Sequence, residues 1–143
     1  MSWHRDRLLL ALSLVVVIGL MASLYGYNDY ASGGQLCDVV FGDGIVDCES
    51  VYVYGYIDIL GLKLHFSELA PVYFILVTLA LSLHILLGLN SLIYLVKALL
   101  YVGLLAIPYL VYLEIFKANA ICIFCTVMHA SIIAGSFISH KLS

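Results

Sequence analysis

Four cysteines are the side chains of this sequence best suited to chemistry, and they fall into two pairs. Cys122 and Cys125 form a CxxC motif, whose thiols lie about one helical turn apart. Such a pair usually exchanges disulfides or binds a metal, because the loop it closes is too short to stabilise a fold by restricting the unfolded chain. Cys37 and Cys48 form a second, more widely spaced pair. The sequence therefore points to thiol redox chemistry or to a metal site.

Two simpler interpretations of these cysteines stay open. Cys37 and Cys48 could close a structural disulfide around the segment FGDGIVD, which would stabilise the fold by ~2–3 kcal/mol in the chain-entropy model. All four thiolates could in principle form a tetrahedral zinc site, although the wide spacing of Cys37 and Cys48 is unlike that of a zinc knuckle. We expect no metal.

The composition predicts an integral membrane protein. Of the 143 residues, 64% are hydrophobic and only 10% are charged, with a mean hydropathy of +1.12. Soluble domains are about 45–50% apolar and about 25% charged. The net charge is −3, and six Lys and Arg residues offer no basic patch that could displace counterions from a nucleic acid. Membrane lipid is therefore an expected partner, and nucleic acid is not.

Four stretches are long enough to cross a bilayer, which takes roughly 20 apolar residues. We place these spans at residues 8–25, 69–89, 92–115 and 121–138. The sequence thus predicts one domain, residues 1–143, that folds as an all-α bundle of four transmembrane helices. The length of the first apolar run favours a retained anchor helix over a cleaved signal peptide. Residues 26–68 form the one long loop, which carries the first cysteine pair.

Charged residues orient this bundle through the positive-inside rule. The basic residues that fall on one side are Arg5, Arg7, Lys97 and Lys141. The loop of residues 26–68, on the opposite side, is rich in Asp and Glu. We expect a multi-pass protein of the cell membrane with both termini in the cytoplasm, and with all four cysteines at the extracytoplasmic face.

The start of the last span sets the chemistry of the CxxC pair. Asn119 is a candidate N-cap, which would put Cys122 near the third helical position, beside unpaired backbone N–H groups and the positive end of the helix dipole. That position lowers the pKa of a thiol and favours the thiolate, the nucleophile in disulfide exchange. Cys125 lies one turn deeper, where it would face the apolar interior of the bundle and a lipid-soluble oxidant.

With these features the chain resembles the vitamin K epoxide reductase family. Members have a four-helix core, a loop cysteine pair after the first helix and a CxxC at the start of the last. The segment CESVYVYGYIDILG, residues 48–61, matches the family's Cys-x-Ser-Val start and its later glycine. The segment YLVYLEIFKANAICIFC, residues 109–125, looks like the family's approach to its CxxC. The disulfide-bond protein B family does similar chemistry but places its CxxC before its second loop pair.

The resemblance implies a route for electrons. Cys37 would exchange with a reduced thioredoxin-like protein, and Cys48 would pass the electrons on to Cys122. Cys125 would then reduce a membrane quinone, such as ubiquinone or menaquinone. These 143 residues include no fused thioredoxin-like domain, and in this they resemble the prokaryotic homologues that lack one. The resemblance therefore implies a separate extracytoplasmic partner.

Three departures from the family concern the quinone contacts. Tyr54 replaces a small hydroxyl residue, Leu64 replaces an asparagine that hydrogen-bonds a quinone oxygen in relatives, and His129 stands where vertebrate relatives have a tyrosine. His65 follows Leu64 and is a candidate substitute for the asparagine. His129 shares a helical face with Cys125 and could donate a hydrogen bond or proton to a quinone. The candidate quinone contacts are therefore His129, Tyr54 and His65.

Two local patterns bear on the ends of the loop. Tyrosines alternate with other residues in VYVYGYI, residues 51–57, which favours a strand, whereas the family suggests a short amphipathic helix on the membrane surface. The tyrosines that could roof a quinone pocket are Tyr52, Tyr54 and Tyr56. Ser67 and Glu68 are the candidate N-cap and first-turn acid of the second span.

These observations together predict a membrane thiol oxidase that supports disulfide formation in exported proteins. The alternative within the enzyme class is quinone or quinone-epoxide reduction as the main activity. The alternative from another class is a non-catalytic membrane scaffold held by structural disulfides or by zinc.

Overall fold

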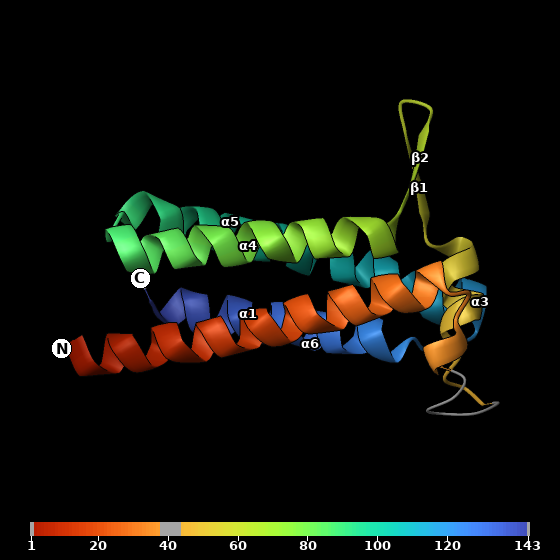
Figure 1. The fold of residues 1–143 in the computed structure, drawn as a ribbon, viewed down its shortest axis with the longest axis horizontal. Coiled ribbons are helices and arrows are strands. Elements are labelled where there is room, and N and C mark those ends of the chain that lie inside the picture. The colour runs from red at the N-terminus through yellow and green to blue at the C-terminus, as the bar shows by residue number, and fades with distance from the viewer. Residues whose placement is uncertain (1, 38–43, 143) are drawn as a thin grey trace.

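The structure, a computed structural model, describes residues 2–37 and 44–142, so part of the segment FGDGIVD lies outside the described residues. Its four long helices are α1 (Ser2–Ala31), α4 (Phe66–Leu87), α5 (Asn90–Tyr112) and α6 (Ile123–Lys141). A π-helical segment, η1 (Leu113–Ala118), continues α5. The shorter elements between α1 and α4 are helix α3 (Cys48–Tyr54) and the strands β1 (Tyr56–Ile59) and β2 (Leu62–His65). Both termini lie at one end of the bundle, and α3 and the strands lie at the other (Figure 1).

Four helices in the described part of the chain are long and apolar enough to cross a membrane, which confirms the predicted four-helix architecture. Two of them extend well past the predicted end of their apolar run at the cysteine side. α1 continues to Ala31, and the third span continues through η1 to Ala118. Both helices continue past the apolar stretch at the cysteine end, so hydropathy alone placed their ends too early.

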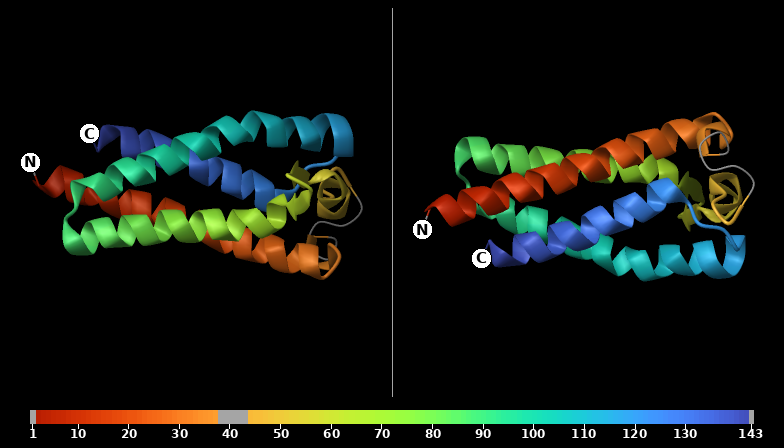
Figure 2. Two further views of the ribbon diagram at one scale, coloured as in Figure 1. Left: turned by 90° about the horizontal axis from the view of Figure 1, so that it is seen from above. Right: turned by 90° about the horizontal axis from the view of Figure 1, so that it is seen from below.

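The helices pack as a bundle in which α1 contacts α4 and α6, and α5 contacts the same two helices. A tight turn joins α4 to α5 at the end that carries the termini (Figure 2), where Gly88 takes a left-handed conformation with φ of 65°. Leu12, Val77 and Leu100 are fully buried between the helices. Large apolar side chains also cover the outside of the bundle, as bilayer-facing helices require.

Two helices have N-caps other than those predicted. α4 has His65 as its N-cap in place of Ser67, because the His65 ring accepts the Ser67 N–H at 3.0 Å while Glu68 accepts the His65 N–H at 3.3 Å. The first-turn role of Glu68 is confirmed. α6 has Cys122 as its N-cap in place of Asn119. Asn119 instead ends η1 in a left-handed conformation with φ of 50°, which prevents it from starting α6.

Residues 51–57 contain both the strand that their alternation suggested and the short helix that the family resemblance suggested. α3 runs to Tyr54, and β1 starts at Tyr56, with Gly55 between them. β1 and β2 pair as an antiparallel hairpin whose register sets Tyr56 opposite His65. The strand prediction therefore holds only for the end of the segment. The hairpin returns the chain to α4 and places His65 beside α3.

Candidate functional site

All four cysteines lie at the end of the bundle opposite the termini. A disulfide joins Cys37 and Cys48, whose Cα atoms are 6.1 Å apart. Cys122 and Cys125 are free thiols. Cys37, Cys48 and Cys122 are buried in one apolar cluster, and Cys125 packs against it. The fold thus brings together two pairs that are far apart in the sequence.

A short backbone bridge fixes the two pairs next to each other. Val46 and Ile121 form a parallel β-bridge, in which the Ile121 N–H donates to the Ile45 carbonyl at 2.9 Å. Val46 lies just before Cys48, and Ile121 lies just before Cys122. The bridge therefore ties the entry to α3 to the entry to α6, the two helices that carry these cysteines at their first turns.

Cys122 occupies the N-cap position of α6, and this position activates its sulfur. The Cys122 Sγ accepts the backbone N–H of Cys125 at 3.5 Å, and it lies at the positive end of the helix dipole. A hydrogen bond from the Cys125 thiol lowers the pKa of Cys122, against the opposing effect of burial. A lowered pKa was expected from the sequence, but its largest cause is the hydrogen bond from the Cys125 thiol, and the N-cap of α6 is Cys122 itself.

Asp29 is a site residue that the sequence reasoning did not find. Its side chain is fully buried, and its carboxylate accepts hydrogen bonds from Leu36 N at 2.8 Å, Cys37 N at 3.3 Å and the Tyr52 hydroxyl at 3.0 Å. One carboxylate oxygen and the sulfurs of Cys37 and Cys48 all lie within 4.8 Å of one another. Since those sulfurs are bonded to each other, the group forms a support for the disulfide. Its signal in the sequence is an acid near the end of an apolar helix.

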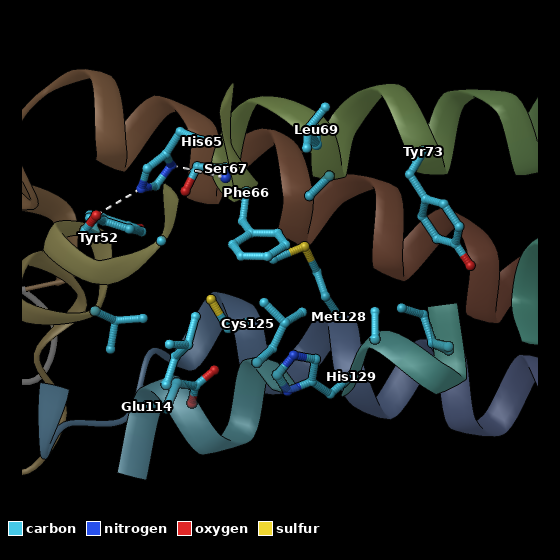
Figure 3. A pocket seen from close by; sticks show the side chains of 17 residues that line it. Tyr52, His65, Phe66, Ser67, Leu69, Tyr73, Glu114, Cys125, Met128 and His129 are labelled. Atoms are coloured by element: carbon cyan, nitrogen blue, oxygen red, sulfur yellow. Dashed lines mark hydrogen bonds between the residues drawn. The ribbon is translucent and has the colours of Figure 1, made fainter. Parts of the chain in front are cut away.

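A cavity of about 220 Å³ lies next to the CxxC pair, between α3, α4, α5, η1 and α6 (Figure 3). For comparison, an apolar cavity of about 150 Å³ can bind benzene. The polar or sulfur-bearing side chains of its wall are Tyr52, His65, Ser67, Tyr73, Glu114, Cys125, Met128 and His129. The rest of the wall is apolar apart from backbone atoms. An apolar ring with a few polar substituents fits such a site.

His129 lies on the cavity wall, as its place one turn beyond Cys125 predicted. The residue is buried, and among the described residues no protein group forms a hydrogen bond with its ring. Figure 3 shows Cys125, Glu114 and His129 on the same side of the cavity. The His129 ring is thus available to a bound molecule.

His65 also borders the cavity, but both of its ring nitrogens are used inside the protein. Nδ1 accepts the Ser67 N–H, so Nε2 carries the proton and donates it to the Tyr52 carbonyl at 2.8 Å. The ring stacks on Tyr30 with centroids 4.0 Å apart. Burial lowers the pKa of His65, which favours this neutral form. His65 therefore holds α3 and the start of α4 together.

The three candidate roof tyrosines have different surroundings. Tyr52 is buried and lines the cavity. Tyr56 packs edge-on against His65 with centroids 4.7 Å apart, and its hydroxyl lies 3.4 Å from that of Tyr30. Tyr54 is 46% exposed and lies outside the cavity wall. Of these three tyrosines, Tyr52 therefore lines the cavity, whereas Tyr56 packs against His65.

Comparison with known proteins identifies the family. A model of the vitamin K epoxide reductase family matches residues 9–140, nearly the whole chain, and the match includes all four cysteines and the cavity. No individual curated protein matches the chain significantly. This family consists of membrane oxidoreductases, in keeping with four apolar helices and a cluster of cysteines at one end of them. The chain belongs to the vitamin K epoxide reductase family.

Proposed function

We propose that this protein oxidises a reduced thioredoxin-like partner outside the cytoplasm and passes the electrons to a membrane quinone, in support of disulfide formation in exported proteins. One observation carries the proposal. The loop disulfide shares a buried cluster with Cys122, and Cys125 of the same CxxC pair lines an apolar cavity. The loop pair thus lies next to the CxxC pair, and the CxxC pair lies next to a site for an apolar acceptor.

The first exchange takes place at the loop disulfide. A thiolate of the partner attacks Cys37, the Cys37–Cys48 bond breaks, and Cys48 leaves as the thiolate. The partner's second thiol then releases Cys37 and completes the partner's disulfide. Both loop sulfurs are buried, so the partner must displace part of the loop as it binds. Two electrons and two protons have then moved to the loop pair.

The second exchange moves the electrons to the CxxC pair. Cys48 attacks an oxidised Cys122–Cys125 disulfide at Cys122, and Cys125 leaves. Cys37 then attacks Cys48 in the mixed disulfide, Cys122 leaves, and the loop disulfide re-forms. The product has a loop disulfide and two CxxC thiols, the combination present in this structure. The shared cluster supports attack by Cys48 at Cys122, and the acidity of Cys122 favours its release as the loop disulfide re-forms.

The wall of the cavity fits a quinone ring. A quinone bound there would accept two electrons and two protons as the Cys122–Cys125 bond forms. The apolar wall would hold the ring, and His129 has a free ring nitrogen for one of its oxygens. Tyr52 closes the wall on the side of α3, held there by its hydrogen bonds to Asp29 and His65.

The same proposal orients the protein in the membrane. Arg5, Arg7 and Lys141 lie near the termini, at the end of the bundle away from the cysteines (Figure 1). The positive-inside rule puts that end in the cytoplasm. The cysteine end then faces the oxidising compartment, where disulfides persist and where exported proteins are found.

Quinone turnover tests the proposal. Protein in lipid vesicles is supplied with a reduced thioredoxin-like donor and a quinone, and quinone absorbance and donor thiols are followed together. We expect wild type to consume one quinone for each dithiol oxidised, and Cys48→Ser and Cys125→Ser to stop quinone consumption. If wild type oxidises the donor while the quinone stays unchanged, the assignment of the acceptor is wrong.

The same vesicle preparation distinguishes the proposed function from epoxide reduction and from a non-catalytic scaffold. Faster reduction of a quinone epoxide than of the quinone would make epoxide reduction the main activity. Stoichiometric zinc in the purified protein, with no turnover of donor thiols, would favour the scaffold. The disulfide between Cys37 and Cys48 already removes two of the four thiolates that such a zinc site needs.

A further inference from the structure

The buried carboxyl group of Glu114 lies in the cavity that also holds Cys125 and His129 (Figure 3). Glu114 is only 6% exposed, although the next residues of η1, Ile115 and Phe116, are exposed. An ionisable side chain in apolar surroundings is costly to retain unless it is paired or takes part in function. The surroundings of Glu114 decide between these two reasons.

No ion pair explains the burial of Glu114. Among the described residues no Lys, Arg or His forms an ion pair with it, and the one donor that acts on its carboxylate is the backbone N–H of Cys122. The carboxyl group also interacts electrostatically with the thiols of both Cys122 and Cys125. Glu114 is therefore positioned with respect to the two sulfurs that must lose protons when they join.

The π-helical turn of η1 puts Glu114 in this position. η1 begins at Leu113, and its wide turn directs Leu113 and Glu114 inward while the next three residues face outward. The Ala120 N–H donates to the Glu114 carbonyl at 3.1 Å, which folds the chain back toward Cys122. Single π-helical turns in longer helices often mark functional sites, because they re-aim a side chain at a local cost.

We propose that Glu114 is a catalytic residue that carries protons from the CxxC thiols to the quinone, an inference that rests on the proposed function. Glu114 takes the proton of the Cys125 thiol and delivers it to a quinone oxygen. The carboxylate, free again and within reach of Cys122, then takes the second proton to the quinone. The Cys122–Cys125 bond forms, its two electrons and the two thiol protons end on the quinone, and quinol leaves. Glu114 is a carboxylate again once the quinone has taken both protons, and it keeps one thiol proton when no quinone is present.

Infrared spectroscopy on quinone-free protein tests whether Glu114 exchanges protons with the CxxC pair. Difference spectra between the dithiol and disulfide states of wild type should contain a carboxyl C=O band. Glu114→Gln should lose that band, whereas Glu49→Gln, which changes an exposed acid on α3, should keep it. A band of full size in Glu114→Gln would overturn the proposal.

Turnover measurements test whether the proton reaches the quinone. Glu114→Gln should reduce quinone turnover by about 100-fold or more, because general acid–base groups contribute roughly 10²–10⁴-fold. Glu114→Asp should recover part of the rate because it keeps the carboxyl group. Glu49→Gln is the control and should turn over quinone at the wild-type rate, because Glu49 is exposed and lies outside the cavity wall.

The outcomes separate this proposal from the proposed function. If wild type turns over quinone and Glu114→Gln does so equally fast, the role of Glu114 is wrong and the proposed function stands. If wild type turns over no quinone, the proposed function is wrong, and so is the proposal that Glu114 delivers protons to a quinone. The infrared band then still decides whether Glu114 exchanges a proton with the two thiols.

Discussion

The Tyr52 hydroxyl donates a hydrogen bond to the Asp29 carboxylate at 3.0 Å, and this contact links the loop disulfide to the cavity. Asp29 also accepts the Cys37 N–H, while the Tyr52 carbonyl accepts the ring of His65. Burial raises the pKa of Tyr52, so its phenol stays protonated as a donor. The two halves of the proposed electron path therefore share one buried hydrogen-bond network.

Removal of the Asp29 carboxylate should destabilise the protein. Asp29→Ala leaves the buried Cys37 N–H and the Tyr52 hydroxyl without their acceptor, and each such loss costs about 1–3 kcal/mol. The midpoint of unfolding in detergent should therefore fall clearly below that of wild type. Glu49→Ala, which removes an exposed acid, serves as the control and should unfold like wild type. Equal stability of Asp29→Ala would show that the network contributes little.

Stability should fall as the pH drops through the titration range of histidine. The pKa of His65 is lowered in the folded state, so below an unfolded value of about 6.5 the unfolded chain binds a proton that folded His65 does not. Stability from this group is thus present at higher pH and is lost as the pH falls toward the folded pKa. The slope is at most about 1.4 kcal/mol per pH unit.

His65→Asn tests the source of that pH dependence. Asparagine can also cap α4, but it does not titrate. Melting curves between neutral and mildly acidic pH should be flatter for the variant than for wild type. Identical pH profiles would assign the effect to other groups.

The Cys125 thiol should control the acidity of Cys122. Because a hydrogen bond from Cys125 is the largest effect that lowers the pKa of Cys122, Cys125→Ala should raise that pKa. Cys125→Ser keeps a hydroxyl donor and should leave the pKa close to the wild-type value. Thiolate absorbance can be titrated directly, since the loop cysteines are in a disulfide. A pKa that is unchanged in Cys125→Ala would assign the acidity to the helix terminus alone.

The cavity should take its ligand from the bilayer beside α5. Ala106 lines the cavity and is also exposed on the outside of α5, so it marks an edge of the cavity that faces lipid. Ala106→Trp should obstruct this edge and raise the KM for quinone severalfold, with donor-thiol exchange unaffected. Leu105→Trp is the control, because Leu105 is 80% exposed and lies outside the cavity wall. Equal KM values for the two variants would place the entrance elsewhere.

The sequence was sufficient to predict the architecture and the grouping of the cysteines. Four apolar runs determine four spans, and an even number of crossings between the loop and the CxxC motif puts Cys48 and Cys122 at the same end. Family membership was also predictable, because it depends on the order of the cysteines along the chain.

Details of the site depended on contacts between segments far apart in the sequence. Asn119 looked like an N-cap because the π-helical turn before it leaves no local sequence signal. His65 looked available to a ligand because its partners on Tyr52 and Ser67 appear only in the folded chain. Asp29 was overlooked for the same reason, since its partner Tyr52 belongs to a different element.

Trapping the intermediate between the two cysteine pairs is the most direct test of the account. Cys125→Ala prevents the CxxC pair from closing, so a disulfide between Cys48 and Cys122 should accumulate and be identified by mass spectrometry of peptides. The double variant Cys48→Ala and Cys125→Ala is the control and should lack it. Accumulation of the Cys48–Cys122 disulfide is the predicted result. The experiment is run under oxidising conditions with donor present. If the Cys37–Cys48 disulfide then stays intact and Cys122 remains a free thiol, the proposed path of electrons is contradicted.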